Sequence, residues 1–190
     1  MSEQRLPPSG HADPSVAILS QIRCFGMRKA VCWDKDSTLA NTSHRHWMVR
    51  DVMEGRRTWI DYALNCAADT PVHSARALMH LLAPSSLQVV TSGAHFEAMV
   101  PVGKWILGNQ FPVDMIRLRR DQEMKIGPAQ LKIRMIEELR EEGYEVVLFV
   151  EDNLATAIEI EEVTEVPTLC LNPRYSPRSQ GIVKEFEVHI

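Results

Sequence analysis

Short apolar runs alternate with helix-like patterns from about residue 29 onward. An apolar run of about 4–8 residues between polar residues is typical of a buried strand, whereas apolar residues that recur every three or four positions indicate an amphipathic helix. The sequence predicts five strands, at Lys29–Trp33, Leu87–Thr91, Asp114–Leu118, Glu145–Val150 and Pro167–Leu171. It predicts helices at His95–Leu107, Ala129–Glu142 and Asn153–Glu162. A repeated order of strand and helix favours right-handed crossovers and a mostly parallel sheet, so we expect an α/β fold.

Residues 42–84 interrupt this alternation. The segment has no convincing strand, but it is rich in large apolar residues such as Trp47, Trp59 and Tyr62. We interpret it as a small helical cap inserted after the first strand. Residues 1–22 are polar and rich in Pro, Ser and Gly, which predicts a flexible N-terminal arm with a short helix near Val16–Ile22. Residues 23–190 are then expected to form one domain that carries the cap.

Composition excludes several classes of protein. Hydrophobic residues make up 45% and charged residues 24% of the 190 positions, which excludes global disorder. We expect no membrane-spanning helix and no secretory signal, because no apolar run reaches about 18 residues and the first residues lack an apolar segment. The net charge of −4 excludes a generally basic nucleic-acid coat, although a local basic patch stays possible. The four cysteines lie far apart in the sequence: Cys24, Cys32, Cys66 and Cys170. This spacing disfavours a zinc ribbon or a disulfide scaffold, and it favours a reducing cytoplasm as the compartment.

Polar side chains gather at the predicted strand ends. Ligands of open parallel sheets bind beyond the carboxyl ends of the strands, so these positions are the candidates for a site. They are Asp34 and Asp36 after the first strand, Ser92 and Gly93 after the second, Glu151 and Asp152 after the fourth, and Lys132 in the first turn of the helix that opens after Pro128. Each signal alone is more typical of a turn, a helix cap or a solvated helix face. Their common edge is what favours a functional site.

The chemistry of this set predicts a metal-assisted phosphate site. Carboxylates that meet at one edge repel each other, and a cation relieves that repulsion. Hard oxygen ligands suit Mg²⁺, which prefers one or two carboxylates together with water and a substrate phosphate. A lysine near a helix start, beside free backbone N–H groups, is suited to holding a phosphate.

Four segments, in order, resemble the motifs of the haloacid dehalogenase (HAD) superfamily. WDKDSTLAN (33–41) resembles DxDGTLxxT, VVTSG (89–93) resembles the second motif, QLKIRMIEEL (130–139) the third, and LFVEDN (148–153) the fourth. The resemblance covers roughly Lys29 to Pro173. It implies a three-layer Rossmann-like, HAD-like parallel sheet with a small helical cap after the first strand.

Within the superfamily, the chain is most similar to phosphatase domains of the polynucleotide kinase/phosphatase type. The segments that carry this similarity are WIDYALNCAADTP (59–71), RLRRD (117–121) and PTLCLNPRY (167–175). There is no GxxxxGK[ST] motif, so we expect no P-loop kinase half in this chain. Three positions depart from the pattern: Ser37 replaces the usual Gly, Ala94 stands where these phosphatases often have Arg, and Glu151 replaces an Asp.

The resemblance implies a mechanism in two steps. Asp34 would attack phosphorus and form an aspartyl-phosphate. Asp36 would protonate the leaving alkoxide and then take a proton from the attacking water, which requires a raised pKa at the start. Mg²⁺ would be held by the Asp34 carboxylate, the Asp36 backbone carbonyl and Asp152, with Glu151 in or beside the coordination shell. The phosphate would be held by Ser92, Gly93 and Lys132.

The sequence leaves several alternatives for the identity of the substrate. The family resemblance favours a 3′-phosphorylated nucleic-acid end, whereas overall acidity favours a nucleotide or a small metabolite phosphate. Several arginines follow the first and third strands, and Arg45 and Arg119 are the candidate substrate contacts among them. These side chains would suit a polyanion if they line the same opening of the site. Because Asp51, Glu54 and Asp61 lie among them, ordinary surface ion pairs are an equal alternative. A catalytically idle HAD-like binding module is the remaining alternative, disfavoured by the intact acidic motif residues.

Overall fold

Strand β1 (Arg28–Trp33) lies at the centre of a five-stranded sheet. The computed structural model describes residues 27–171. The strand order is β5-β4-β1-β6-β7, and every neighbouring pair is parallel. The other strands are β4 (Leu87–His95), β5 (Met115–Arg119), β6 (Tyr144–Glu151) and β7 (Thr168–Cys170). All five predicted strands are therefore present in the sheet, and each differs from its predicted bounds by a few residues at most.

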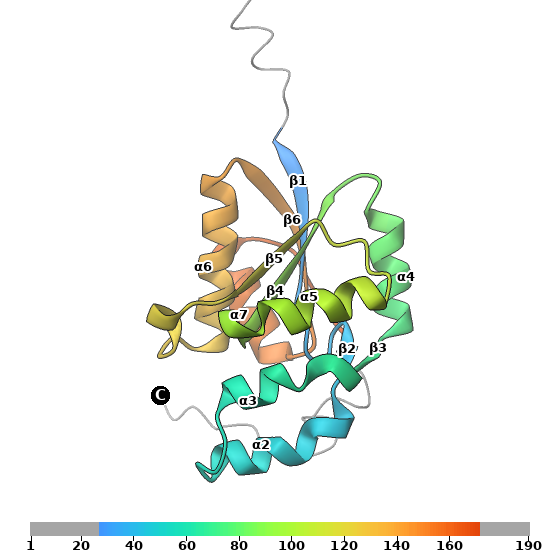
Figure 1. Ribbon diagram of the computed structural model, residues 1–190. Coiled ribbons are helices and arrows are strands. Elements are labelled where there is room, and N and C mark those ends of the chain that lie inside the picture. The colour runs from blue at the N-terminus through green and yellow to red at the C-terminus, as the bar shows by residue number, and fades with distance from the viewer. Residues whose placement is uncertain (1–26, 172–190) are drawn as a thin grey trace, which may run out of the picture.

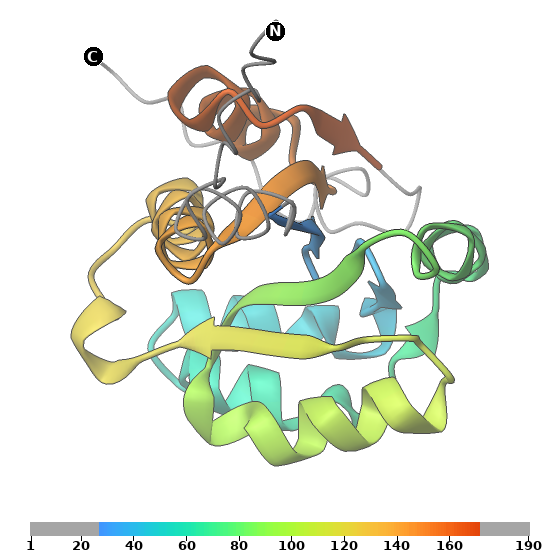
Figure 2. The same ribbon diagram turned by 90° about the horizontal axis from the view of Figure 1, so that it is seen from above.

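Helices cover both faces of the sheet and make three layers (Figure 2). Successive residues of a strand point to opposite faces. Val31 and Trp33 accordingly pack with α4 (His73–Leu82) and α5 (Met99–Gly108), whereas Ala30 and Cys32 pack with α6 (Pro128–Glu141) and α7 (Leu154–Thr164). The predicted α/β three-layer architecture is confirmed.

The segment after β1 projects beyond the carboxyl ends of the strands (Figure 1). It contains the 3₁₀ turn η1 (Ser43–Arg45), helices α2 (His46–Met53) and α3 (Trp59–Leu64), and the turn η2 (Cys66–Ala68). Its base is a short antiparallel pair of β2 (Ala40–Asn41) and β3 (Thr70–Pro71). Strand β3 lies within a segment in which we predicted no strand. Two residues of pairing are too short to leave a periodic pattern in the sequence.

Residues 42–84 thus divide into two parts. Helices α2 and α3 share a small apolar cluster of their own, formed by Met48, Val49 and Tyr62. Helix α4, by contrast, places Ala75 and Met79 in the main core beside β1. The projecting helices therefore end before α4, which is one of the layer helices of the sheet.

Two short 3₁₀ turns complete the order of elements. Turn η3 (Phe96–Ala98) precedes α5, so the helix predicted from His95 begins at Met99, after β4 has continued through His95. Turn η4 (Asp121–Glu123) lies between β5 and α6. The predicted N-terminal arm, with its short helix near Val16–Ile22, lies outside the described residues. Within residues 27–171, none of the helices has the length and apolar character needed to cross a bilayer.

Candidate active site

The carboxyl ends of β1 and β6 bring three acidic side chains together. Asp34 directly follows β1, and its backbone N–H donates to the Val150 carbonyl of β6 at 2.8 Å. Glu151 ends β6, and Asp152 follows it. Oxygens of Asp34, Glu151 and Asp152 all lie within 4.8 Å of one another, and all three residues are buried. Parallel neighbouring strands end at the same edge, which is why residues 117 positions apart converge.

Lys132 reaches this acidic cluster from α6. Gly127 and Pro128 begin the helix, and Lys132 is its fifth residue, so it lies in the second turn rather than in the predicted first turn. Its ammonium lies 2.7 Å from Asp34 Oδ1 and also donates to Glu151 Oε2. A buried ammonium between two carboxylates can hold the oxygens of a phosphoryl group as negative charge develops on them.

The cluster brings three carboxylates close to the Lys132 ammonium, and the pKa values of two of the carboxyl groups are raised. Burial raises the pKa of Asp34 to about 7; Lys132 opposes this shift, and the Glu151 carboxylate adds to it. Burial also raises the pKa of Glu151, with a further upward contribution from Asp152. Two of the three carboxylates, those of Asp34 and Glu151, pair with the Lys132 ammonium.

These residues fit a divalent cation. A buried cluster with excess negative charge and three convergent hard oxygens matches the ligands that Mg²⁺ prefers. Asp34, Glu151 and Asp152 would hold the ion, and the raised pKa values of Asp34 and Glu151 reflect a burial cost that a cation would relieve. Asp36 was predicted to bind the metal through its backbone carbonyl, and its carboxylate is not part of this cluster.

Asp36 instead pairs with two cations. Its Oδ1 accepts hydrogen bonds from Lys35 Nζ at 2.7 Å and from the Arg45 guanidinium at 2.8 Å. Burial alone would raise the pKa of Asp36, but Arg45 and Lys35 outweigh it and hold that pKa well below its ordinary value. Our expectation of a raised pKa at Asp36 is therefore wrong, because sequence order did not show that both neighbouring cations turn toward this carboxylate.

Sequence reasoning missed Asp69, a buried carboxylate at the end of η2. It accepts hydrogen bonds from Lys35 and Arg45 at 2.7–2.8 Å, and Nε2 of His44 lies 2.9 Å from it. Its only signal in the sequence was its place in the segment WIDYALNCAADTP (59–71), which carries part of the family resemblance. His44 therefore lies against Asp69, whereas His46 Nε2 lies 3.0 Å from Thr42 Oγ1.

Ser92 and Gly93 occupy the end of β4. Ser92 is buried, and its Oγ accepts from the Ala94 backbone N–H at 3.2 Å. The carbonyl of Gly93 accepts from Arg119 Nε at 3.1 Å. The Ser92 hydroxyl, which accepts this hydrogen bond, can also donate one to a ligand. Gly93 has no side chain and can contribute only its backbone groups to the site.

Most of the arginines considered as a polyanion surface are engaged within the protein. Arg119 also donates to the carbonyls of Glu123 and Ile126, at 2.6 and 2.7 Å, and so braces the connection between β5 and α6. Arg45 is 1% exposed and stacks on the Tyr62 ring at 4.0 Å. The remaining pairs join Arg56 and Arg57 to Asp51, Arg117 to Glu142, and Arg120 to Glu123 and Glu138. These contacts favour the ion-pair alternative.

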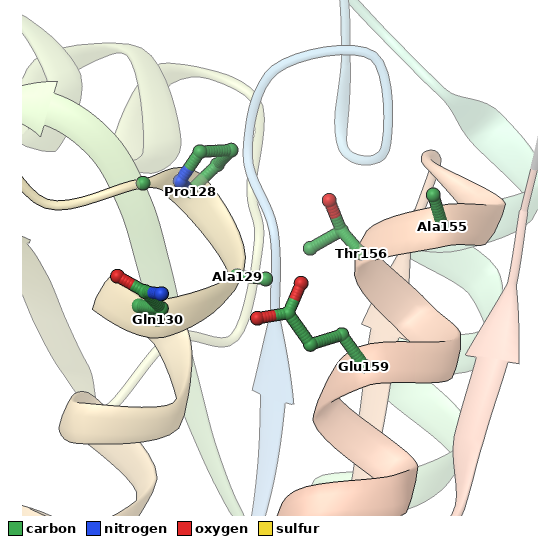
Figure 3. A pocket seen from close by; sticks show the side chains of 7 residues that line it. Pro128, Ala129, Gln130, Ala155, Thr156 and Glu159 are labelled. Carbon is green, nitrogen blue, oxygen red and sulfur yellow. The ribbon is translucent and has the colours of Figure 1, made fainter. Parts of the chain in front are cut away.

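A separate cavity of about 180 Å³ lies between the first turns of α6 and α7 (Figure 3). Its lining residues are Gly127, Pro128, Ala129, Gln130, Ala155, Thr156 and Glu159. None of the predicted site residues lines it. The Glu159 carboxylate faces the first turn of α6 across it and would repel a phosphate, so the candidate site is the carboxylate and lysine cluster.

Comparisons with known proteins agree with this architecture. No protein-family model and no curated protein match the sequence. Solved structures do: a chain in a structure of the Pnkp1/Rnl/Hen1 complex superposes with a TM-score of 0.61 at 16% identity, over 77% of this chain and 47% of that chain. The chain has a haloacid dehalogenase-like fold.

Two further structures carry this fold. The class C acid phosphatase from Bacillus anthracis has a TM-score of 0.55 at 15% identity, over 90% of this chain and 79% of that one. The HAD-hydrolase YfnB from Bacillus subtilis, in a structure bound to magnesium, has a TM-score of 0.53 at 11% identity, over 77% and 87%. The HAD-like chain described here spans less than half of the matched chain from the Pnkp1 complex.

Proposed function

We propose that this protein is a Mg²⁺-dependent phosphomonoesterase that works through an aspartyl-phosphate on Asp34. One observation carries the proposal: the Asp34 carboxylate lies 2.7 Å from the buried Lys132 ammonium and shares its edge of the sheet with Glu151 and Asp152. A nucleophile, a cation for the phosphoryl group and a set of metal ligands are thus together. The HAD-like fold, which the acid phosphatase and YfnB share, supports the same chemistry.

Each side chain of the site has its own role in the proposed reaction. Asp34 attacks phosphorus and displaces the leaving oxygen, so that one difficult step becomes two easier ones. Lys132 neutralises charge on the transferred group, and the Ser92 hydroxyl donates a hydrogen bond to one of its oxygens. Mg²⁺, held by Asp34, Glu151 and Asp152, would supply further stabilisation of the negative charge.

Asp36 is the proposed acid and base. Its ionised state suits the second step, in which it accepts a proton from the attacking water. The first step requires a proton on the same carboxylate, and the negative charge of a bound phosphate would raise its pKa while Lys35 and Arg45 keep it in place.

The direct test is Asp34→Asn. We expect hydrolysis of para-nitrophenyl phosphate with Mg²⁺ by the wild-type chain, its loss in EDTA, and a fall of at least about 10³-fold in the variant, because the nucleophile is removed. Asp121→Asn, at an exposed carboxylate bonded to His95, is the matched control and should keep full activity. Turnover by Asp34→Asn at the wild-type rate would remove Asp34 from its role, and an inert wild-type chain would favour the idle binding module.

We propose as substrate a phosphate at a nucleic-acid end, in particular a 3′-phosphate, or a nucleotide. The support is the similarity of fold to a chain of the Pnkp1/Rnl/Hen1 complex, which is described as an RNA repair complex, and the local sequence resemblance noted above. A panel of 3′- and 5′-phosphorylated oligonucleotides beside the mononucleotides tests this choice. Preference for the 3′-phosphorylated oligonucleotide is the expected result.

A small metabolite phosphate is the second candidate. The observation that favours it is the pairing of Arg45, Arg117 and Arg120 with protein carboxylates, which leaves them unavailable for a long phosphate backbone. Higher kcat/KM on small sugar or acid phosphates than on any nucleotide would select it.

A further inference from the structure

A buried set of four charged groups joins the projecting helices to the strand end. We call it the junction cluster, formed by Lys35, Asp36, Arg45 and Asp69. Lys35 and Asp36 come from the turn after β1, Arg45 from η1, and Asp69 from the return of the chain after η2. Lys35 and Arg45 are each 1% exposed, so the cluster is closed to solvent except at Asp36.

Asp69 is the hub of the junction cluster. One of its oxygens, Oδ2, accepts from Lys35 Nζ and from Arg45 at 2.7 Å, while Oδ1 accepts from Arg45 Nε at 2.8 Å. Its backbone carbonyl accepts from the Trp105 indole of α5 at 2.7 Å. The same Lys35 Nζ and Arg45 Nη2 atoms that contact Asp36 are therefore also held by Asp69, and Asp69 itself is fixed to the core.

The two cations converge on a single oxygen of Asp36. Lys35 Nζ and the Arg45 guanidinium both donate to Oδ1. Within residues 27–171, no hydrogen bond reaches Oδ2 of the same carboxylate. The side chain of Asp36 is 28% exposed, in contrast to the three other members. The junction cluster thus binds Oδ1 of Asp36 and leaves Oδ2 for an incoming group.

Stability alone is a weak explanation for such a cluster. Taking two cations and two carboxylates out of water costs several kcal/mol for each ion, and well-packed apolar residues are often equally or more stabilising. What the ionic arrangement adds is orientation, because hydrogen bonds from two directions select one rotamer of Asp36.

We propose that Asp69 is a positioning residue that orients Asp36 for proton transfer by holding Lys35 and Arg45 against it. This inference rests on the proposed function, since it concerns the acid and base of that reaction. Asp69 touches neither Asp34 nor the acidic cluster in the contacts above, so it acts through its two cations. The projecting segment that carries Arg45 and Asp69 would thereby contribute to proton transfer as well as to substrate access.

The test compares two leaving groups in Asp69→Asn, an isosteric variant that removes the charge. Para-nitrophenolate leaves readily and needs little protonation, whereas an alkoxide, as in a nucleoside 3′-phosphate, needs the acid. We expect kcat on the alkyl ester to fall about tenfold more than kcat on the aryl ester, with KM changing little. In an Asp36→Asn background the same substitution should cause no further change in that ratio, because the group it orients is gone.

Asp51→Asn is the matched control, since Asp51 also accepts from two arginines, which lie between α2 and α3, but is at the surface. Its ratio of alkyl to aryl turnover should equal that of the wild type. If circular dichroism shows that Asp69→Asn is unfolded, Lys35→Met, which removes one donor to Asp36, is measured in the same way.

The outcomes separate this inference from the proposed function. Equal losses on both esters, or a change in ratio that persists in the Asp36→Asn background, would overturn the positioning role while phosphatase activity of the wild type still supports the function. A wild-type chain inactive on every ester would overturn both.

Discussion

Ser37 adopts a left-handed backbone conformation, with φ 70°, at the position where the HAD motif has glycine. A side chain in this region costs about 1–2 kcal/mol through contact of Cβ with the backbone. The turn is nevertheless kept, since the Ser37 N–H donates to the Ala40 carbonyl at 2.8 Å. The sequence departure noted at this position thus leaves the local geometry in place at an energetic cost.

We predict that Ser37→Gly stabilises the protein. Relief of the strain exceeds the larger entropy of glycine in the unfolded chain, so the free energy of unfolding should rise by about 0.5–1 kcal/mol. Urea denaturation measures it. Ser37→Ala keeps Cβ and removes only the hydroxyl, so an equal gain in that variant would contradict the backbone explanation.

Asp34 leads to a prediction about pH. Because burial raises its pKa to about 7, the carboxylate is protonated below that value and must lose its proton to bind a cation. Affinity for Mg²⁺ should therefore weaken as pH falls through about 7, approaching tenfold for each pH unit. Calorimetric titration between about pH 8 and pH 5.5 measures it, and constant affinity across that range would contradict the prediction.

At the scale of elements, the start of α7 fixes the position of the metal ligands. Asn153 is its N-cap: the side chain accepts from the Ala155 N–H at 3.2 Å and donates to Thr156 Oγ1 at 2.5 Å. Its own N–H donates to Glu151 Oε1 at 3.1 Å. Asn153, where the predicted helix begins, thus caps α7, and it also restrains Glu151.

We predict that Asn153→Ala lowers the free energy of unfolding by about 0.5–2 kcal/mol, the usual cost of a lost N-cap. The apparent affinity for Mg²⁺ should fall as well, because the turn that carries Glu151 and Asp152 is less restrained. Thermal unfolding and Mg²⁺ titration measure the two effects. Asn153→Ser keeps a capping oxygen and should lose less than half as much stability, and a Ser variant as unstable as the Ala variant would argue against capping.

At the scale of the whole molecule, charge is balanced locally. The net charge of −4 is accompanied by arginines that pair with carboxylates across elements, such as Arg117 of β5 with Glu142 after α6. A protein that tracks a nucleic-acid backbone keeps its cations available for phosphates. The arrangement here favours recognition of one terminal phosphate.

We therefore predict a weak dependence on salt. A plot of log kcat/KM against log salt concentration for a 3′-phosphorylated oligonucleotide should have a slope no steeper than about −2, because few phosphates are neutralised. A mononucleotide 3′-phosphate, measured in the same buffers, is the control. A slope of about −4 or steeper would indicate an extended basic surface and contradict the prediction.

Sequence by itself determined the sheet and the identity of the cluster at its edge. Apolar periodicity specified the strands and layer helices, because burial on one or both faces leaves a repeat that is local in the chain. The placement of Asp34, Ser92 and Asp152 followed, since parallel strands end at one edge.

Only the tertiary structure decided how the charged side chains pair. Lys35, Arg45 and Asp69 lie up to 34 positions apart, and Asp69 had no periodic signal, so their convergence on Asp36 could not be read from spacing. The direction of a long side chain depends on which partner is close and how much water is excluded. For that reason the pKa of Asp36, the engagement of the arginines and the end of the projecting helices before α4 emerged only from the folded chain.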